Sequence, residues 1–548
     1  MALFNLLVGL GIFLYGISQL ENALRQLGRT RLQQLFEPGP QLKSTDADSQ
    51  LHAWKSVALG VITTALLQSS SMVSLMVQAL AAAGLIPLVN GIGVILGANL
   101  GTTLTGWLVT LLGFKLSLDS LSIPLMGIAC LGLIFYPANR QTQNGFTALL
   151  GIGLLLFGLG QMKAAVEYLP ATLPMDQLAN WSPLGFLLLG TVLTALIQSS
   201  SATMMVALTA LHSGLLELPA AAALIIGADL GTTSTSVLAS IRGSNIKKQL
   251  ALAHITFNLV VDMLAFILLL PILPQILSAL GLHDPLFSLV AFHSLFNLIG
   301  LSLFIPFIHP FTRWIGNFFQ DDEESRYPDL AEVSVKEPEV ALAALRHTSH
   351  LLVGDAIELN RLSLPFSEQD EEEELSDDEF ASRYEALKTT ESRLLTRAGE
   401  LQQSPLETEQ THRLNRWIGC AREAVLSVRS IKGLREDLEN LEQGEFGPFQ
   451  QHFQHELDKL YRPVLPLRSG NHDSHYVQEC LQQFERNNTL MHEHLHNLII
   501  EEGTRHHTSG GDLSTLLNIN REIWQATDRL HDALEFLLLE TPAVEFKD

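Results

Sequence analysis

Two short polar strings of nearly the same sequence interrupt long apolar stretches of the chain. Residues 64–71 read TALLQSSS and residues 194–201 read TALIQSSS, at an offset of 130 residues (198 minus 68). Serine hydroxyls and glutamine amides donate hydrogen bonds, so each string offers donors to an oxyanion. A bilayer core makes such polar groups costly unless they have partners. One serine-rich patch would favour helix–helix adhesion, but two matched copies favour the binding site of a transporter.

A second pair of strings keeps the same offset. Residues 97–103 read GANLGTT and residues 227–233 read GADLGTT, so Asp229 stands where the first copy has Asn99. We interpret each string as a break in a membrane helix, whose free carbonyls and threonine hydroxyls bind sodium. A carboxylate at membrane depth indicates a functional site, and Asp229 would neutralise one cation. The alternative is that Asp229 is protonated or hydrogen-bonded and has a structural role.

The apolar segments beside the TALLQSSS and TALIQSSS strings are too short to cross a bilayer, which takes about 20 residues. Residues 56–68 and 72–85 are therefore predicted to form a re-entrant hairpin, and residues 184–215 a second one. The serines of the first tip would precede a half-helix that begins at Met72. There, free backbone N–H groups and the helix dipole attract an anion.

No Lys or Arg lies near these tips, so a bound phosphate would keep its negative charge. Moving one charge across a membrane costs about 2.3 kcal/mol per 100 mV, so a dianion that enters a negative interior needs co-moving cations. The expected phosphate-binding residues are Gln68, Ser69, Ser70, Ser71, Gln198, Ser199, Ser200 and Ser201. The expected sodium ligands are Thr64, Asn99, Thr102, Thr103, Thr194, Asp229, Thr232 and Thr233.

Charge divides the 548-residue chain near residue 320. The part up to Gln320 carries 12 Lys+Arg and 11 Asp+Glu, which leaves 22 basic and 46 acidic residues for the rest. The first part therefore reads as a membrane domain and the second as an acidic soluble one, which argues against a nucleic-acid partner. The three cysteines indicate neither a disulfide framework nor a Cys-x-x-Cys metal site. The start, Met1 to Phe4, has no basic n-region, so we expect no cleaved signal peptide.

The basic residues between Arg25 and Lys55 place that loop in the cytoplasm and the N-terminus outside. The stretch before the second hairpin lacks this charge, so the second hairpin is predicted to enter from the opposite face, as in inverted-topology repeats. We expect about seven spans, at Phe4–Leu20, Leu88–Leu112, Leu121–Tyr136, the helix after Asn144, Leu218–Ser240, Leu250–Leu270 and Leu286–Ile308.

A further short motif occurs twice, once on each of the last two predicted spans. His254 and His293 each begin an HxxFN string, and Asp262 follows one turn after Asn258. A structural, hydrogen-bonding role is the favoured interpretation of both histidines, with proton transfer as the alternative. The sequence assigns no role to Asp262.

The tail shows helical spacing of apolar residues, for example from Leu516 to Leu534. The predicted helices are 340–362, 379–403, 407–441, 449–460, 476–502 and 513–539. Asp528 and Asp532 are one helical turn apart and flank His531, but an exposed polar face explains them, so no metal ligand is assigned.

The duplicated QSSS strings and the GANLGTT string with its partner, in this order, resemble the type II sodium-dependent phosphate cotransporter family over about residues 5–310. The resemblance implies that Gln68–Ser71 and Gln198–Ser201 line the phosphate and sodium sites, with Asn99, Thr102, Thr103, Thr232 and Thr233 nearby. The tail resembles the PhoU-like domains that are fused to bacterial members, which implies regulation by phosphate status.

We therefore expect an all-α fold: a polytopic membrane transporter of inverted repeats with two re-entrant hairpins, followed by a soluble antiparallel helical bundle. The expected domains are a membrane transport domain at 1–320, a linker at 321–338 and a cytoplasmic PhoU-like bundle at 339–548. Within the first, repeat 1 covers about 1–137, repeat 2 about 144–270, and an extra span 286–309.

The expected function is sodium-coupled secondary transport of inorganic phosphate across the cytoplasmic (inner) membrane by alternating access. One alternative is export of phosphate, or carriage of another small oxyanion, on the same fold. A second is a membrane-anchored phosphate sensor. No hydrolase or kinase motif indicates an enzyme, and no organic cofactor is expected. Besides phosphate, sodium and the lipid bilayer, the partners considered are a second copy of the chain and a cytoplasmic regulator that binds the acidic bundle.

Overall fold

The computed structural model forms two compact units, each with its own core. Unit 1 comprises Met1–Ala82 and Ile86–Asp322, and unit 2 comprises Ala83–Leu85 and Glu323–Asp548. All regular secondary structure in the described part of the chain is helical. The described residues are 2–36, 49–115, 118–136, 140–167, 181–319, 327–333, 335, 338–363, 376–404, 406–442, 456–457, 459–469, 474–505 and 510–539.

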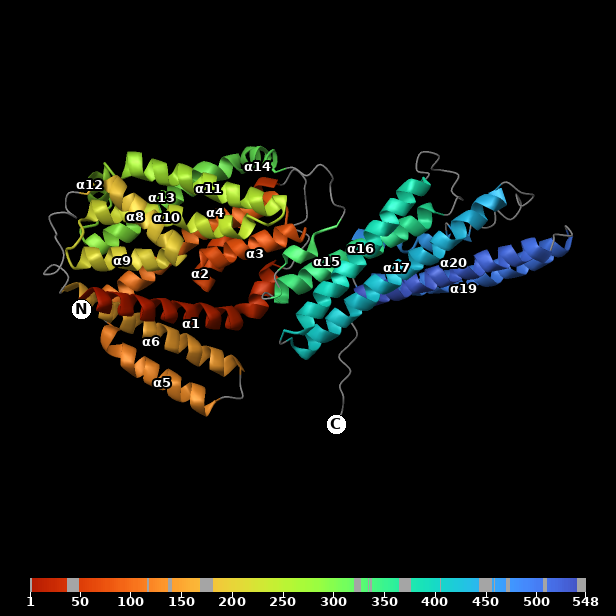
Figure 1. The fold of residues 1–548 in the computed structure, drawn as a ribbon, viewed down its shortest axis with the longest axis horizontal. Helices are drawn as coiled ribbons and strands as arrows, with labels where there is room; N and C mark the ends of the chain where they lie inside the picture. Colours follow the sequence, from red (N-terminus) through yellow and green to blue (C-terminus); the bar gives the residue numbers. More distant parts are fainter. Residues whose placement is uncertain are drawn as a thin grey trace. The chain divides into compact units, whose positions relative to one another are not determined.

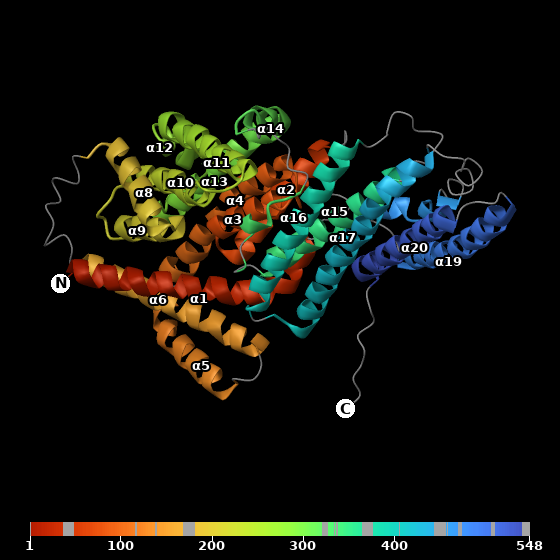
Figure 2. The same ribbon diagram turned by 45° about the vertical axis from the view of Figure 1, so that its right-hand side comes forward.

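Unit 1 holds the membrane helices in two series of similar order (Figures 1 and 2). The first series is α1 (Ala2–Phe36), α2 (Ser49–Leu67), α3 (Ser70–Ala82), α4 (Leu88–Val109) and α5 (Ser122–Phe135). The second is α6 (Arg140–Glu167), α8 (Pro183–Ile197), α9 (Ser200–His212), α10 (Leu218–Ser240) and α11 (Asn245–Leu264), followed by α12 (Leu273–Ala279), α13 (Pro285–Phe304) and α14 (Ile308–Gly316).

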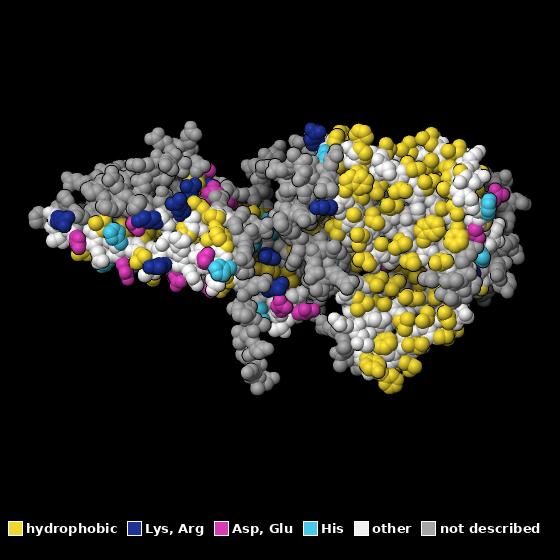
Figure 3. Space-filling model, turned by 180° about the vertical axis from the view of Figure 1, so that it is seen from behind, with side chains coloured by type: hydrophobic (Ala, Val, Ile, Leu, Met, Phe, Trp, Pro, Cys, Tyr) yellow, Lys and Arg dark blue, Asp and Glu magenta, His cyan; other side chains and the backbone are white. Residues whose placement is uncertain are grey.

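Six helices in the described residues are long and apolar enough to cross a membrane. They agree with six of the seven expected spans. At the seventh, expected at Leu121–Tyr136, the structure has the apolar helix α5, whose 14 residues are fewer than the about 20 of a typical span, so this span stays a prediction. The surface of unit 1 fits a bilayer, since exposed hydrophobic side chains are spread over the face seen in Figure 3.

The expected helix breaks at 97–103 and 227–233 are also wrong. Both strings lie inside unbroken α-helices, α4 and α10. Their glycines permit close helix packing instead, since a Cβ on Gly97 would overlap the Val57 carbonyl oxygen of α2. A Cβ on Gly227 would overlap the Leu187 carbonyl oxygen of α8 in the same way. Small residues in membrane helices allow such backbone approach, so these glycines seat each hairpin against its long helix.

Glycines on both helices allow the same close approach between α1 and α6. A Cβ on Gly9 would lie 2.9 Å from the Met162 backbone nitrogen, and one on Gly158 would lie 2.5 Å from the Phe13 backbone nitrogen. These two helices begin the two series, and they pack along each other, with α5 against α6 (Figures 1 and 2).

Unit 2 is a set of long helices, α15 (Pro338–Leu362), α16 (Asp377–Gln402), α17 (Thr408–Glu442), α19 (Ser474–Arg505) and α20 (Gly510–Leu538). These agree with five of the six predicted tail helices. Most of the sixth, at 449–460, lies outside the described residues. Part of the segment expected as a linker is packed into this unit, because Leu330 and Val333 are buried and Tyr327 donates a hydrogen bond to Asp355 (2.5 Å).

Candidate substrate and cation site

Both hairpin tips have the same local backbone. α2 ends at Leu67 and α8 at Ile197, and the next residue, Gln68 or Gln198, is left-handed with φ of +58° in each case. Glycine adopts this conformation more cheaply, so two glutamines held there carry backbone strain of the kind that clusters at functional sites. The left-handed residue turns the chain into the second helix of the hairpin.

Serines cap the second helices. The Ser69 hydroxyl accepts a hydrogen bond from the Met72 amide, and the Ser199 hydroxyl accepts one from the Ala202 amide, both at 3.3 Å. The first half-helix therefore begins at Ser70, two residues before its expected start. Helix-opening amides have no carbonyl of a preceding turn to bond, so they can serve an anion. The first two amides of each helix belong to Ser70, Ser71, Ser200 and Ser201.

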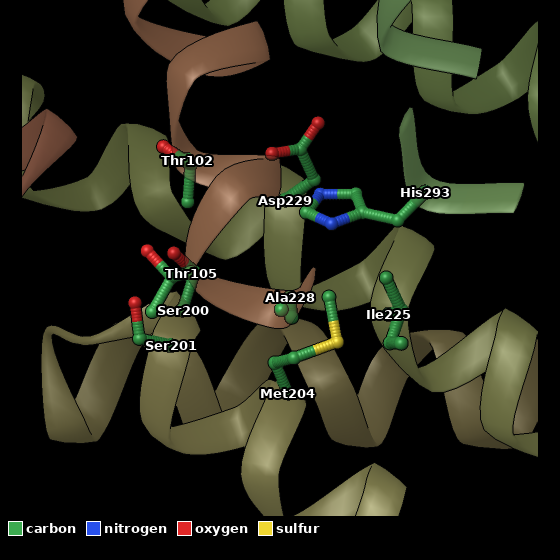
Figure 4. Close-up of a pocket in the computed structure, with 10 residues that line it drawn as sticks. Thr102, Thr105, Ser200, Ser201, Met204, Ile225, Ala228, Asp229 and His293 are labelled. Carbon is green, nitrogen blue, oxygen red and sulfur yellow. The ribbon is translucent and has the colours of Figure 1, made fainter. Parts of the chain in front are cut away.

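A pocket with about 270 Å³ of free space, including the part open to solvent, lies beside the second tip. Helices α4, α9, α10 and α13 form its wall. In Figure 4, Ser200, Ser201 and Thr105 occupy one side, while the Asp229 carboxylate and the His293 ring occupy the other. Thr102 completes the polar lining, and Met204 and Ile225 are among its apolar residues.

The first tip reaches this pocket through one hydrogen bond. The Thr105 hydroxyl donates to Gln68 Oε1 (3.0 Å), and the Gln68 amide donates to the Ala65 carbonyl (2.6 Å). Gln68 thus orients a threonine of the pocket wall without lining the wall itself. The pocket is therefore built from residues of both series, with the second tip in the wall and the first tip behind it.

The structure brings four expected site residues together at the pocket: Thr102, Ser200, Ser201 and Asp229. The expected phosphate residues at the first tip do not line it, and Ser70 is buried. At the second tip, Gln198 is exposed. The other expected residues outside the wall are Ser69, Ser71, Ser199, Thr64, Asn99, Thr103, Thr194, Thr232 and Thr233.

The threonines of the GANLGTT and GADLGTT strings bond to their own helices. Thr102 and Thr232 each donate to the carbonyl four residues earlier (3.0 Å), and Thr103 and Thr233 donate to the carbonyl three residues earlier (2.9 and 2.7 Å). A hydroxyl that donates to a carbonyl keeps its lone pairs, so Thr102 can still offer an oxygen to a cation in the pocket.

A short amide chain joins the two copies at Asn99 and Asp229. The Asn99 amide donates to Asn258 Oδ1, and the Asn258 amide donates to the Asp229 carbonyl oxygen (2.9 Å). The matched positions of the two series thus meet at one residue of α11, close to the pocket wall.

The histidines divide into two roles. His254 Nδ1 lies 2.9 Å from the Ser236 hydroxyl, away from the pocket, as the structural interpretation predicts. His293 lines the pocket, which that interpretation missed. Thr105 was missed as well, although Thr235 repeats it at the offset of 130 residues and could have signalled it.

Comparison with known proteins gives consistent matches. The family model described as Na+/Pi-cotransporter matches residues 12–164 and 175–282. "Uncharacterized protein YqeW" of Bacillus subtilis (strain 168) is 28% identical over 312 residues, which is 55% of this chain and 94% of the relative. "Putative inorganic phosphate export protein YjbB" is 28% identical over 411 residues in Escherichia coli O157:H7 (71% of this chain, 70% of the relative). In Escherichia coli (strain K12) it is 29% identical over 352 residues (60% and 61%). No solved structure matches.

Proposed function

Through its membrane unit the chain belongs to the Na+/Pi-cotransporter family, and from this premise we propose that it carries inorganic phosphate across the membrane with sodium as the coupling ion. The pocket shared by the two halves supports this proposal. Phosphate would bind to the serine hydroxyls and helix-opening amides at Ser200 and Ser201, opposite Thr105. Such donors suit an oxyanion, because its oxygens accept hydrogen bonds from several directions.

The negative charge of the residues that line the pocket supports the binding of a cation there. The described pocket wall holds a carboxylate, Asp229, and neither Lys nor Arg. A phosphate beside a carboxylate in a buried site is repelled unless a cation lies between them or a proton neutralises one of them. Hard oxygen ligands such as Asp229 and the Thr102 hydroxyl suit sodium, so we infer that sodium binds together with phosphate.

Access would alternate around this site. Each hairpin tip is seated by close backbone packing against a long helix, and the Gln68–Thr105 bond ties the first tip to the wall that the second tip completes. In the proposed cycle the two halves rock against each other around the bound phosphate, as in other transporters of inverted repeats. The proposed orientation has the N-terminus outside and unit 2 in the cytoplasm, as the charge of the loops predicts.

Export is the second candidate, because the names of the YjbB relatives refer to inorganic phosphate export. It needs no other site, since a carrier of this kind works in the direction that its gradients set. Export and import then differ only in the sign of the combined electrochemical gradients of sodium and phosphate.

The test is reconstitution of the full chain in liposomes, with labelled phosphate outside or preloaded inside. An inward sodium gradient should drive accumulation against the phosphate gradient, and an outward gradient should drive release. Choline in place of sodium should reduce both to the level of empty liposomes. Equal flux in sodium and in choline would refute sodium coupling, and no flux in either direction would refute transport.

A further inference from the structure

A second acidic residue lies behind Asp229, outside the pocket wall. Asp262 is on α11, one turn after Asn258, and Asn258 bonds the Asp229 carbonyl. The two carboxylates are close enough to act on each other electrostatically. Their side chains are deeply buried, with 4% of Asp229 and 1% of Asp262 exposed. Burial of two neighbouring carboxylates is costly unless a positive charge compensates them.

Both acids have carboxylate oxygens without a hydrogen-bond partner in the described part of the chain. Among the described residues, Asp229 Oδ2 and both carboxylate oxygens of Asp262 have no hydrogen-bond partner. A third, uncharged residue adds to the set: Asn297 on α13 interacts with the Asp229 side chain, yet its own Oδ1 is buried and unpartnered in the described structure. Four acceptor oxygens from three helices thus lack a donor.

Among the described residues, no fixed cation is placed to serve them. Of the helices that pack around α11, α3, α4, α10 and α13 include neither Lys nor Arg in their described residues. Arg313 is on α14, whose end meets the start of α11, where Gln249 donates to the Gly316 carbonyl. On α11 itself the basic residues are Lys247 and Lys248. Lys248 precedes Asp262 by 14 residues, about 21 Å along a helix.

We propose that Asp229, Asp262 and Asn297 bind one sodium ion behind the phosphate pocket. Asp229 belongs to the pocket wall, and Asp262 adds a second carboxylate from outside it. Carboxylate and amide oxygens are the ligands that hard cations prefer. Asp229 belongs both to this site and to the pocket wall, so the ion would set the charge that phosphate meets. The coupling part of this inference rests on the proposed function.

Binding of sodium can be measured without transport. The purified full chain in detergent, without phosphate, is heated in rising NaCl, with choline chloride holding the ionic strength constant. A ligand that binds only the folded state raises the unfolding midpoint with the logarithm of its concentration once this exceeds the dissociation constant, and a fit of the rise gives the concentration at which the site is half-saturated. We expect this rise in the wild type, and Asp262→Asn should raise the half-saturating sodium concentration at least tenfold. A wild-type midpoint that is indifferent to sodium, or an unchanged half-saturation in Asp262→Asn, would overturn the proposal.

Two further variants serve as a second test of the site and as a control for charge. Asn297→Ala removes a neutral oxygen from the site and should also weaken sodium, so the test remains available if Asp262→Asn does not fold. Glu217→Gln removes one negative charge from the exposed start of α10 and should leave the sodium half-saturation at the wild-type value. An equal loss in Glu217→Gln would mean that general charge, not this site, governs the response, and would overturn the proposal.

A proton shared by the two acids is the rival occupant, and pH separates it from sodium. Protons compete with sodium for carboxylates, so the half-saturating sodium concentration should rise as pH falls. The other titratable groups on the packed helices are His254 on α11 and His293 on α13, with His309 and Arg313 on α14 and the two lysines at the start of α11. Stabilisation by acid that is the same in sodium and choline would identify the proton and overturn the sodium site.

Labelled-phosphate flux in liposomes, measured on the same variants, keeps this inference separate from the proposed function. Sodium-dependent flux with an unaltered half-saturation in Asp262→Asn would leave transport standing and refute the site. Sodium stabilisation that Asp262→Asn abolishes, in a protein without phosphate flux, would establish the site and refute transport.

Discussion

The two hairpins of the membrane unit share a backbone but differ in how their side chains are partnered. Thr194 donates its hydroxyl to Thr203 (2.8 Å) across the second hairpin. In the first hairpin the matching residues are Thr64 and Val73, and the Thr64 hydroxyl has no partner in the described part of the chain. The duplicated frame therefore tolerates different polar connections at the same positions.

At the glutamines it is the first hairpin whose side chain has a partner, and the second whose side chain has none among the described residues. Gln68 is bonded to Thr105, whereas Gln198 is exposed and the matching Thr235 hydroxyl is buried without a partner among the described residues. At the string on the long helices, neutral Asn99 uses its amide on Asn258, while Asp229 keeps an unpartnered carboxylate oxygen. The first copy thus supplies neutral groups to the pocket, among them Thr102 and Thr105, and the second supplies the serine donors and the carboxylate.

The largest effect on stability should come from the glycines that both copies use to pack a hairpin helix against its long helix. Gly227→Ala places a methyl group against the Leu187 carbonyl, and Gly97→Ala does the same at Val57, where backbone cannot move aside. Overpacking of this kind costs about 3 kcal/mol. Both variants should unfold at clearly lower temperature in detergent, and by similar amounts. Gly127→Ala, which meets nothing within 4 Å, is the control and should not be destabilised. Tolerance of Gly227→Ala would contradict the packing.

Asp229→Asn removes the main chemical difference between the copies. If the carboxylate compensates a cation, sodium-driven phosphate flux in liposomes should fall at least tenfold, equivalent to about 1.4 kcal/mol or more. Raising sodium should restore part of the flux, because the loss lies in cation binding. Glu217→Gln again controls for loss of one negative charge. Wild-type flux and sodium dependence in Asp229→Asn would remove the charge asymmetry from the mechanism.

The sequence predicts the hairpins well because the relevant signals are local. A helix that is too short for a bilayer, a run of serines that can cap, and a second copy at a fixed offset locate both tips within two residues. The unbroken helices could not be predicted in this way. Whether Gly97 breaks a helix or admits a neighbour depends on what lies opposite, and the Val57 carbonyl is 40 residues away in the chain.

The pocket was predictable only in part for the same reason. Ser200 and Asp229 carry the motifs, and their meeting at one wall follows from the duplicated arrangement. His293 belongs to the HxxFN repeat and Thr105 recurs as Thr235, but that these two side chains face the pocket follows from helix packing alone. Asp262 is marked in the sequence only as a buried acid, and its proximity to Asp229 depends on how α10 and α11 align.

The serines offer a narrower comparison of the two tips. Ser200 lines the pocket, whereas its counterpart Ser70 is buried outside the wall. Ser200→Ala removes one neutral donor, worth about 1 kcal/mol, so the phosphate dissociation constant should rise about fivefold. Ser70→Ala should change it less than twofold. Equilibrium binding of labelled phosphate at saturating sodium measures both, and equal losses would show that the two tips contribute alike.

The smallest effect should separate the two left-handed glutamines. Glycine relieves the strain at φ of +58°, but Gln68→Gly also loses the bonds to Ala65 and Thr105, which together outweigh that gain and give a net cost of about 1 kcal/mol. Gln198 makes no such bonds among the described residues, so Gln198→Gly should be neutral or stabilising by a few tenths of a kcal/mol. Unfolding midpoints of the two variants, measured side by side, give the sign. If Gln198→Gly is the more damaging variant, the bonds of Gln68 do not set the difference in stability between the two tips.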